Sequence, residues 1–134
     1  MAQNETEAAF QRLSQKLIKE HWDFYPTAGS RIGQHEYDGR LPDLSPSQNA
    51  RREGELRRGL AELRTLDADS LDEASRLSYR IMDLFLRREL FIFNDLKPLE
   101  DNPMRHTGYL NVSGYMRRDY APLEDRLRSA TSAL

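Results

Sequence analysis

Residues 70–97, SLDEASRLSYRIMDLFLRRELFIFNDLK, decide the fold of this chain. They contain neither proline nor glycine, the two residues that most disfavour a helix interior. Ser70 and Glu73 have the spacing of a capping box, which is typical of a helix N-terminus. Apolar side chains follow at the spacing of one helix face, namely Leu71, Ala74, Leu77, Ile81, Leu84 and Phe85. The stretch therefore predicts one long helix.

The two halves of this predicted helix differ in character. In the first half the opposite face is charged, so we expect one side in solvent. Residues 90–93 are all apolar, and a helix that is apolar all round is covered all round. The three charged residues before them, Arg87, Arg88 and Glu89, point about 100° apart and cannot all face solvent there. We interpret them as structural ion pairs in preference to catalytic groups.

Three further helices are predicted around this one. The first covers about 5–25 and stops before Pro26, because proline disfavours a helical conformation in the preceding residue. The second covers about 45–66, with Ser45 as N-cap and Pro46 in the first helical position. The last covers 121–134. Leucines form a narrow apolar edge on the second helix, at Leu56, Leu60, Leu63 and Leu66.

The predicted fold class is therefore all-α, with about four long helices in a bundle-like array. Residues 26–44 and 98–120 carry most of the glycines and prolines and are predicted to be irregular. The composition agrees, because the chain has 19 Leu but only 4 Ile and 1 Val. Few β-branched residues favour helix over sheet. At 134 residues the chain is one domain or part of one.

Composition also excludes several classes of function. The 20 basic and 22 acidic side chains nearly balance, which gives no general attraction to nucleic acid or anionic lipid. There is no cysteine, so no disulfide, thiolate nucleophile or cysteine-bound zinc is possible. The N-terminal residues lack the pattern of a signal peptide, and no run reaches the roughly 18 apolar residues of a membrane span. We expect a cytoplasmic protein with no membrane and no nucleic-acid partner.

Two motifs resemble metal sites and fail on spacing. His35 and Glu36 begin a zinc-protease pattern, but the residue four places after His35 is Gly39 instead of histidine. Asp67 opens a possible calcium loop, but its sixth and twelfth positions are Asp72 and Ser78 where glycine and glutamate are required. No catalytic residue, metal ligand or cofactor is predicted in this chain.

Polar residues of the two irregular stretches are the candidate interaction or cleft-wall residues. Long connections in compact domains are often functional or are held down by their own side chains. The second possibility, a loop fixed by tyrosine packing and by pairing of an arginine with an aspartate, stays open. The candidates are His35, Tyr37, Asp38, Arg40, Asn102, Tyr109, Asn111 and Tyr115.

Two blocks of motifs give the sequence a family resemblance. The first is Tyr-Asp-Gly-Arg-Leu-Pro-Asp at 37–43. The second holds Asn-Pro at 102–103, Arg-Asp-Tyr-Ala-Pro-Leu at 118–123 and Arg-Leu at 126–127. Together they resemble the N-terminal part of the bacterial domain-of-unknown-function 885 family, whose members are mostly helical and look like zinc-dependent metallopeptidases of the gluzincin type.

The resemblance implies a hydrolase parent, but no site residue can be carried over from it. The family's His-Glu-x-x-His type zinc motif has no counterpart in this chain. The implied protein is an inactive N-terminal helical fragment, with zinc only in the full-length parent and the rest of that parent as its partner. The apolar 90–93 segment and the last helix also predict that the isolated fragment self-associates as a homo-oligomer, such as a dimer.

Three interpretations follow. The first is this non-catalytic part of a zinc peptidase. The second is a stand-alone helical interaction or oligomerisation module with no chemistry. The third, a small nucleic-acid binder, is disfavoured by the balanced charge.

Overall fold

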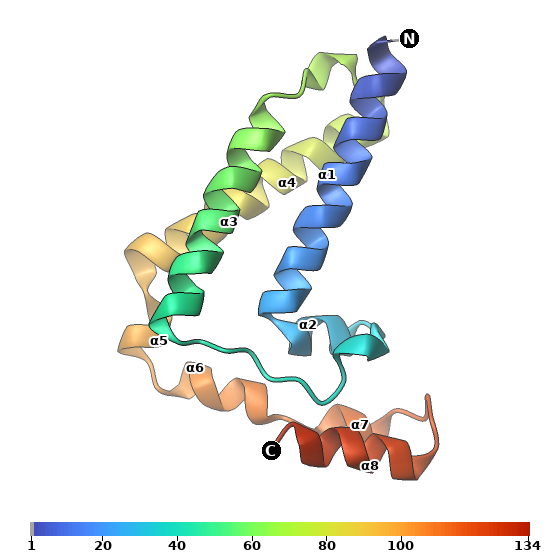
Figure 1. The fold of residues 1–134 in the computed structure, drawn as a ribbon, viewed down its shortest axis with the longest axis vertical. Helices are drawn as coiled ribbons and strands as arrows, with labels where there is room; N and C mark the ends of the chain where they lie inside the picture. The colour runs from blue at the N-terminus through green and yellow to red at the C-terminus, as the bar shows by residue number, and fades with distance from the viewer. Residues whose placement is uncertain (1) are drawn as a thin grey trace. The chain divides into compact units, whose positions relative to one another are not determined.

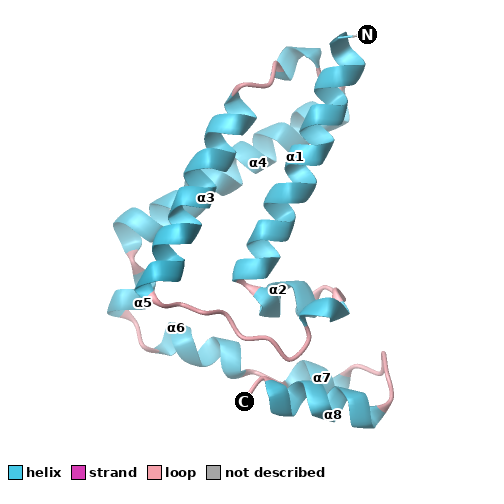
Figure 2. Cartoon of the chain, in the orientation of Figure 1, coloured by secondary structure: helices cyan, strands magenta, loops and turns pink. Residues whose placement is uncertain are grey.

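The computed structural model describes the backbone of residues 2–134 and the side chains of residues 5–98 and 100–134. Every regular element over that range is helical and none is a strand (Figure 2). The all-α prediction is confirmed. The chain divides into two compact units. Unit 1 comprises Met1–Glu20 and Ser45–Lys97, and unit 2 comprises His21–Leu44 and Pro98–Leu134.

Unit 1 is built from three long helices that lie side by side (Figure 1). Two of them are joined by a short 3-10 turn, and a π-helical turn extends the last one. Residue Lys97 has a left-handed backbone (φ 39°), which ends this last helix. The elements are α1 (Ala2–Phe24, in this unit up to Glu20), α3 (Pro46–Arg64), η2 (Ala68–Ser70), α4 (Glu73–Phe91) and η3 (Ile92–Leu96).

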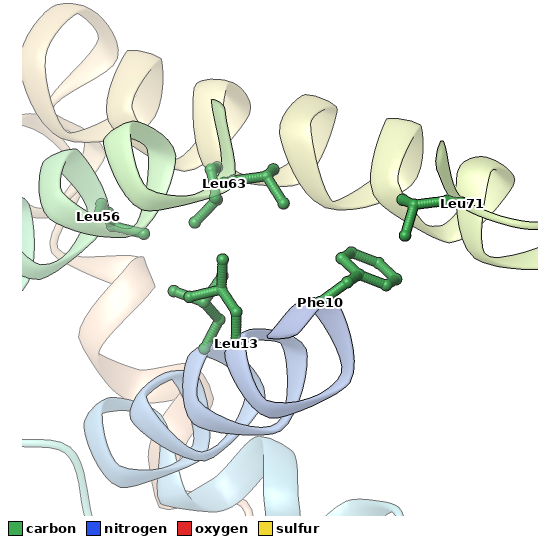
Figure 3. Packing of buried hydrophobic residues seen from close by; sticks show 7 residues of the cluster. Phe10, Leu13, Leu56, Leu63 and Leu71 are labelled. Atoms are coloured by element: carbon green, nitrogen blue, oxygen red, sulfur yellow. The ribbon is translucent and has the colours of Figure 1, made fainter. Parts of the chain in front are cut away.

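Leucine side chains from all three helices form the core of unit 1. Figure 3 shows Phe10 and Leu13 of α1 pointing toward Leu56 and Leu63 of α3, with Leu71 beside Phe10. These residues are buried, as are Leu17 and Leu86. Burying one such side chain stabilises a fold by about 1.5–3 kcal/mol. The apolar edge predicted for the second helix is therefore the one that packs.

The N-cap of α4 is not the predicted one. Asp72 occupies that position, and its carboxylate accepts the backbone N–H of Ser75 at 2.7 Å. The hydroxyl of Ser70 instead donates to the carboxylate of Asp67. Asp67 also accepts the N–H of Asp69 at 3.2 Å. Because this acidic side chain organises residues 68–70 as a separate turn, the helix begins three residues later than predicted.

The prediction of which face of α4 is buried was also wrong. Leu77, Ile81 and Leu84 are 60%, 59% and 61% exposed. Phe91 is half-exposed too, so the C-terminal end is not covered all round. The helix has a second stripe, and this one faces α1 and α3. It consists of Ser75, Tyr79, Met82, Leu86, Glu89 and Leu90.

Polar residues hid this second stripe in the sequence. Ser75 is buried because its hydroxyl donates to the carboxylate of Glu7. Glu89 is buried because its carboxylate accepts from Arg88 at 3.1 Å. Buried polar groups are tolerated when they are hydrogen-bonded. The structural ion pairing expected in this region is therefore present.

One face of α3 is charged, and part of it is a solvated face with ion pairs along the helix. Arg57 pairs with Glu53 at 2.7 Å, as on a solvated helix. Arg52 does not follow this pattern, because its side chain is only 1% exposed. Its Nη1 lies 3.6 Å from Oε2 of Glu55, and its charge also acts on Glu89. A buried guanidinium surrounded by carboxylates thus lies inside unit 1.

Burial raises the pKa of Glu89, and the nearby Arg88 and Arg52 only partly offset this. A carboxyl whose pKa is higher in the folded than in the unfolded state binds more protons when folded. Its contribution to the free energy of unfolding therefore falls as pH rises from about 4.5 through the folded pKa.

Glutamine cannot ionise, so the Glu89→Gln variant should not show this decrease in the free energy of unfolding as the pH rises. The variant should gain stability relative to the wild type as the pH rises above about 4.5, and the gain should level off once the pH has passed the folded pKa of Glu89. Urea unfolding followed by circular dichroism at several pH values measures the difference. A difference that does not change with pH would contradict the burial of this charge.

Unit 2 contains the two stretches predicted to be irregular, and the prediction holds only in part. Residues 38–44 form no regular element, whereas 26–31, 35–37 and most of 98–117 form short helices of three to six residues. Such short helices depend on tertiary contacts for stability. The elements are α2 (Pro26–Arg31), η1 (His35–Tyr37), α5 (Pro98–Asp101), α6 (Met104–Thr107), η4 (Gly108–Leu110), α7 (Ser113–Arg117) and α8 (Leu123–Ser132).

Unit 2 has a small core of its own. Tyr115 of α7 packs with Ala130 and Ala133, and Val112 and Tyr120 lie against them. Three leucines at the C-terminal end of this unit, Leu123, Leu127 and Leu134, are exposed and add nothing to this core. A core with so few large apolar residues must be held together by polar contacts, which form the site described next.

Candidate binding pocket

The carboxylate of Asp38 is the centre of the polar network in unit 2. It accepts hydrogen bonds from the hydroxyl of Ser30, from Nδ1 of His35 at 3.0 Å and from the hydroxyl of Tyr120 at 2.7 Å. The side chain of Asp38 is only 9% exposed. The rings of His35 and Tyr120 stack with centroids 3.8 Å apart. One carboxylate thus fixes three side chains from three segments of the chain.

Tyr120 is held as a neutral hydroxyl donor. Burial raises its pKa well above 10, and the hydrogen bond to the negative Asp38 raises it further. The tyrosine therefore keeps its proton through the neutral and mildly alkaline range. It remains available to donate to Asp38, and its ring is held against His35.

Tyr115 anchors the turn after Asp38. Its hydroxyl accepts the backbone N–H of Gly39 at 2.9 Å. Gly39 has φ 73°, a conformation that side chains rarely adopt, and a Cβ there would lie 3.0 Å from the carbonyl oxygen of Ser129. Only glycine fits at this position, so α7 and α8 both constrain this turn.

We expect Gly39→Ala to destabilise unit 2 by about 1–3 kcal/mol through backbone strain and the close contact. Gly33→Ala is the matched control. Gly33 also has a positive φ (95°), but a Cβ there would meet nothing within 4 Å. Both variants carry backbone strain, but only Gly39→Ala adds a close contact. The difference between their melting temperatures therefore measures the cost of that contact. Equal melting temperatures would contradict the tight contact of Gly39 with α8.

Tyr37 and Arg40 have packing roles. Tyr37 is buried, edge-on to Trp22 at 6.2 Å, and its ring would lie 2.8 Å from a Cβ at position 29. The guanidinium of Arg40 lies over the Tyr37 ring, 5.0 Å from its centroid. This cation–π contact replaces the arginine–aspartate pairing that the sequence suggested. The loop is thus fixed partly by its own side chains.

A cavity of about 230 Å³ opens beside the Asp38 network, and every residue that lines it belongs to unit 2. Four of the eight candidate residues line it: His35, Tyr109, Asn111 and Tyr115. Asp38 holds three of the lining side chains, those of Ser30, His35 and Tyr120, without lining the cavity itself. Asn102 is not part of it, since its side chain accepts the N–H of Met104 at 3.0 Å near the start of α6.

Sequence reasoning missed several lining residues, among them Ser30, Arg31, Arg118 and Tyr120. A signal was present for the last two. Arg118 and Tyr120 belong to the Arg-Asp-Tyr-Ala-Pro-Leu block, which we used for the family resemblance but not for choosing site residues. Ser30 and Arg31 carried no signal, because they face the pocket only once α2 is packed against α7.

The pocket is electrostatically positive. Nη1 of Arg118 donates to the carbonyl oxygen of Arg31, and Nη2 of Arg31 lies 3.5 Å from the carbonyl oxygen of Gly108. Neither arginine has a carboxylate partner within the described part of the chain. No aspartate or glutamate lines the cavity. Asp38, which lies behind three of the lining side chains, already accepts three hydrogen bonds.

No group of three or more potential metal-binding side chains occurs among the described residues. Across the same range, no helix combines the length and the apolar character that crossing a bilayer requires.

The described residues form an all-α fold with a compact pocket in unit 2. The family of the chain follows from comparison with known proteins. The model of a family described as bacterial protein of unknown function (DUF885) matches residues 26–134. The chain belongs to this family. No curated protein and no solved structure matches it.

Proposed function

We propose that this chain is the non-catalytic helical part of a zinc-dependent peptidase of the gluzincin type, and that it supplies a wall of the substrate-binding cleft. On its own it is inactive. Membership of the family and the motif blocks at 37–43 and 102–127 support this proposal. Hydrolysis and zinc binding belong to other parts of the parent protein.

The observation that carries the proposal is the pocket on a fixed frame. Asp38 holds the side chains of Ser30, His35 and Tyr120. In a nucleophile activated by a base, the serine hydroxyl would bond to the histidine. Here Ser30 and His35 both bond to the Asp38 carboxylate and not to each other. The arrangement is suited to recognition.

Two measurements test this role. The 134-residue chain should hydrolyse no peptide and should retain no stoichiometric zinc after dialysis. One zinc per chain, or hydrolysis that a chelator abolishes, would contradict it. In the full-length protein, Arg118→Gln should raise KM with little change in kcat, as expected when binding and not chemistry is lost.

The second candidate is a helical interaction or oligomerisation module. The exposed stripe of α4, formed by Leu77, Ile81, Leu84 and Phe91, favours it. Exposed contiguous apolar surface often marks an interaction site. In sedimentation equilibrium at micromolar concentration this module would form a dimer that Ile81→Glu dissociates and Ser78→Glu, on the same helix, does not. A 15.6 kDa monomer would exclude it.

A further inference from the structure

We propose that the pocket of unit 2 binds a carboxylate carried on a small apolar or aromatic group, with Arg31 and Arg118 as the anion-binding pair. The C-terminal residue of a peptide has this chemistry. The inference rests on the proposed role of the pocket as a recognition wall, and it names the class of ligand.

The charge of the pocket is the first argument. Two arginines line it, and neither has a carboxylate partner among the described residues, although acidic side chains outnumber basic ones in the chain by 22 to 20. Most other arginines of unit 2 are engaged: Arg126 and Arg128 pair with acids, and Arg40 lies over a tyrosine. A guanidinium presents a planar fork of donors that matches a carboxylate. An anionic group is therefore the natural complement.

Size and wall chemistry are the second argument. The cavity of about 230 Å³ is smaller than the roughly 300–1,000 Å³ of typical ligand sites and equals the volume of about eight waters. Its walls include Tyr109, Tyr115 and Tyr120. Tyr109 is itself stacked on Tyr25 at 6.3 Å. Aromatic walls around an arginine pair suit a single apolar residue that ends in a carboxylate.

Preorganisation is the third argument. The guanidinium of Arg118 is held by the carbonyl oxygen of Arg31, so the two arginines are already brought together. His35 and Tyr120 are fixed by Asp38, and Asn111 accepts the N–H of Ser113 at 3.0 Å. Side chains that are ordered before binding lose little entropy on binding. The site is thus built in the absence of ligand.

Isothermal titration of the 134-residue chain tests the inference. The probes are N-acetyl-alanyl-phenylalanine, its C-terminal amide, 3-phenylpropionate and inorganic phosphate. We expect the free acid to bind at least about tenfold more tightly than the amide, because charge-assisted hydrogen bonds are lost with the carboxylate. Binding of phenylpropionate as tightly as the peptide acid assigns the site to small acids, and weaker binding assigns it to peptide ends. Equal binding of acid and amide, no binding, or binding of phosphate alone would overturn the inference.

Variants locate the anion site. Arg31→Gln and Arg118→Gln should each weaken binding of the acid by about tenfold or more, whereas Arg117→Gln, an exposed neighbour outside the pocket, should not. If Arg118→Gln unfolds, Arg31→Gln decides, because its guanidinium makes only a long contact to Gly108. Equal affinities in all three variants would refute the arginine pair. Zinc retention by the chain would refute its proposed non-catalytic role and leave this binding result untouched.

Discussion

Replacing Arg52 with methionine is expected to destabilise unit 1 by about 3–5 kcal/mol. The guanidinium is almost fully buried, and it faces Glu55 and Glu89, while its charge also acts on Glu20. Methionine fills much of the volume but removes the buried positive charge that acts on all three carboxylates, so that Glu55 and Glu89 keep only their pairs with the more exposed Arg51 and Arg88. Removing one partner of a buried ion pair costs far more than the pair itself contributes.

The neighbouring residue provides the control. Arg51 is largely exposed and pairs with the same Glu55 at 2.9 Å. Exposed pairs contribute about 0–1 kcal/mol, so Arg51→Met should change stability little. Adding Glu89→Gln to Arg52→Met should recover part of the loss, since one uncompensated charge is then removed. Urea unfolding measures all three variants. Equal stability of Arg51→Met and Arg52→Met would contradict the buried site.

Replacing Arg126 with alanine is expected to destabilise unit 2 by about 3–5 kcal/mol and to abolish binding in the pocket. The buried guanidinium donates to three carbonyl oxygens, those of Ala121 at 2.8 Å, Arg118 at 2.8 Å and Tyr115 at 3.2 Å. It also pairs with Asp119 at 3.1 Å. Hydrogen bonds to a charged group contribute about 1.5–3 kcal/mol each but are not additive. Without them the segment that carries Arg118 and Tyr120 is no longer held.

Lysine should not rescue this position, because a single ammonium cannot reach acceptors spread along residues 115–121. Arg128→Ala is the control, since Arg128 is exposed and pairs with exposed acids of its own helix. Trp22 lies in unit 2 against Tyr37, and its fluorescence follows the unfolding of this unit. A fully stable Arg126→Lys variant would show that a positive charge is sufficient. It would contradict the claim that the separate hydrogen bonds of the guanidinium hold residues 115–121.

The fold class and the leucine core were predictable because they rest on local pattern. Leu56 and Leu63 repeat at seven residues on a helix whose start is set by Ser45 and Pro46, so their face was unambiguous. The core of α4 was not, because that helix carries two apolar stripes. Which stripe packs depends on the partner of Ser75, Glu7, which lies 68 residues away, and on burial of Glu89 beside its exposed neighbour Arg88.

The pocket was only half predictable for a similar reason. His35, Tyr109, Asn111 and Tyr115 stood out as polar or aromatic residues in stretches rich in glycine. Arg126 belongs to the Arg-Leu pair of the second motif block, but the sequence does not indicate that its acceptors are the carbonyl oxygens of Tyr115, Arg118 and Ala121. The role of Asp38 depends on Tyr120, which lies 82 residues away.

The central claim is that unit 2 provides a preformed recognition pocket, and NMR of the ¹⁵N-labelled chain titrated with N-acetyl-alanyl-phenylalanine tests it most directly. We predict saturable shifts confined to amides of the pocket, including Arg31, Asn111, Gly114 and Arg118, with no change at Leu56 in the core of unit 1. Absence of shifts, or shifts along the exposed stripe of α4 instead, would contradict the account.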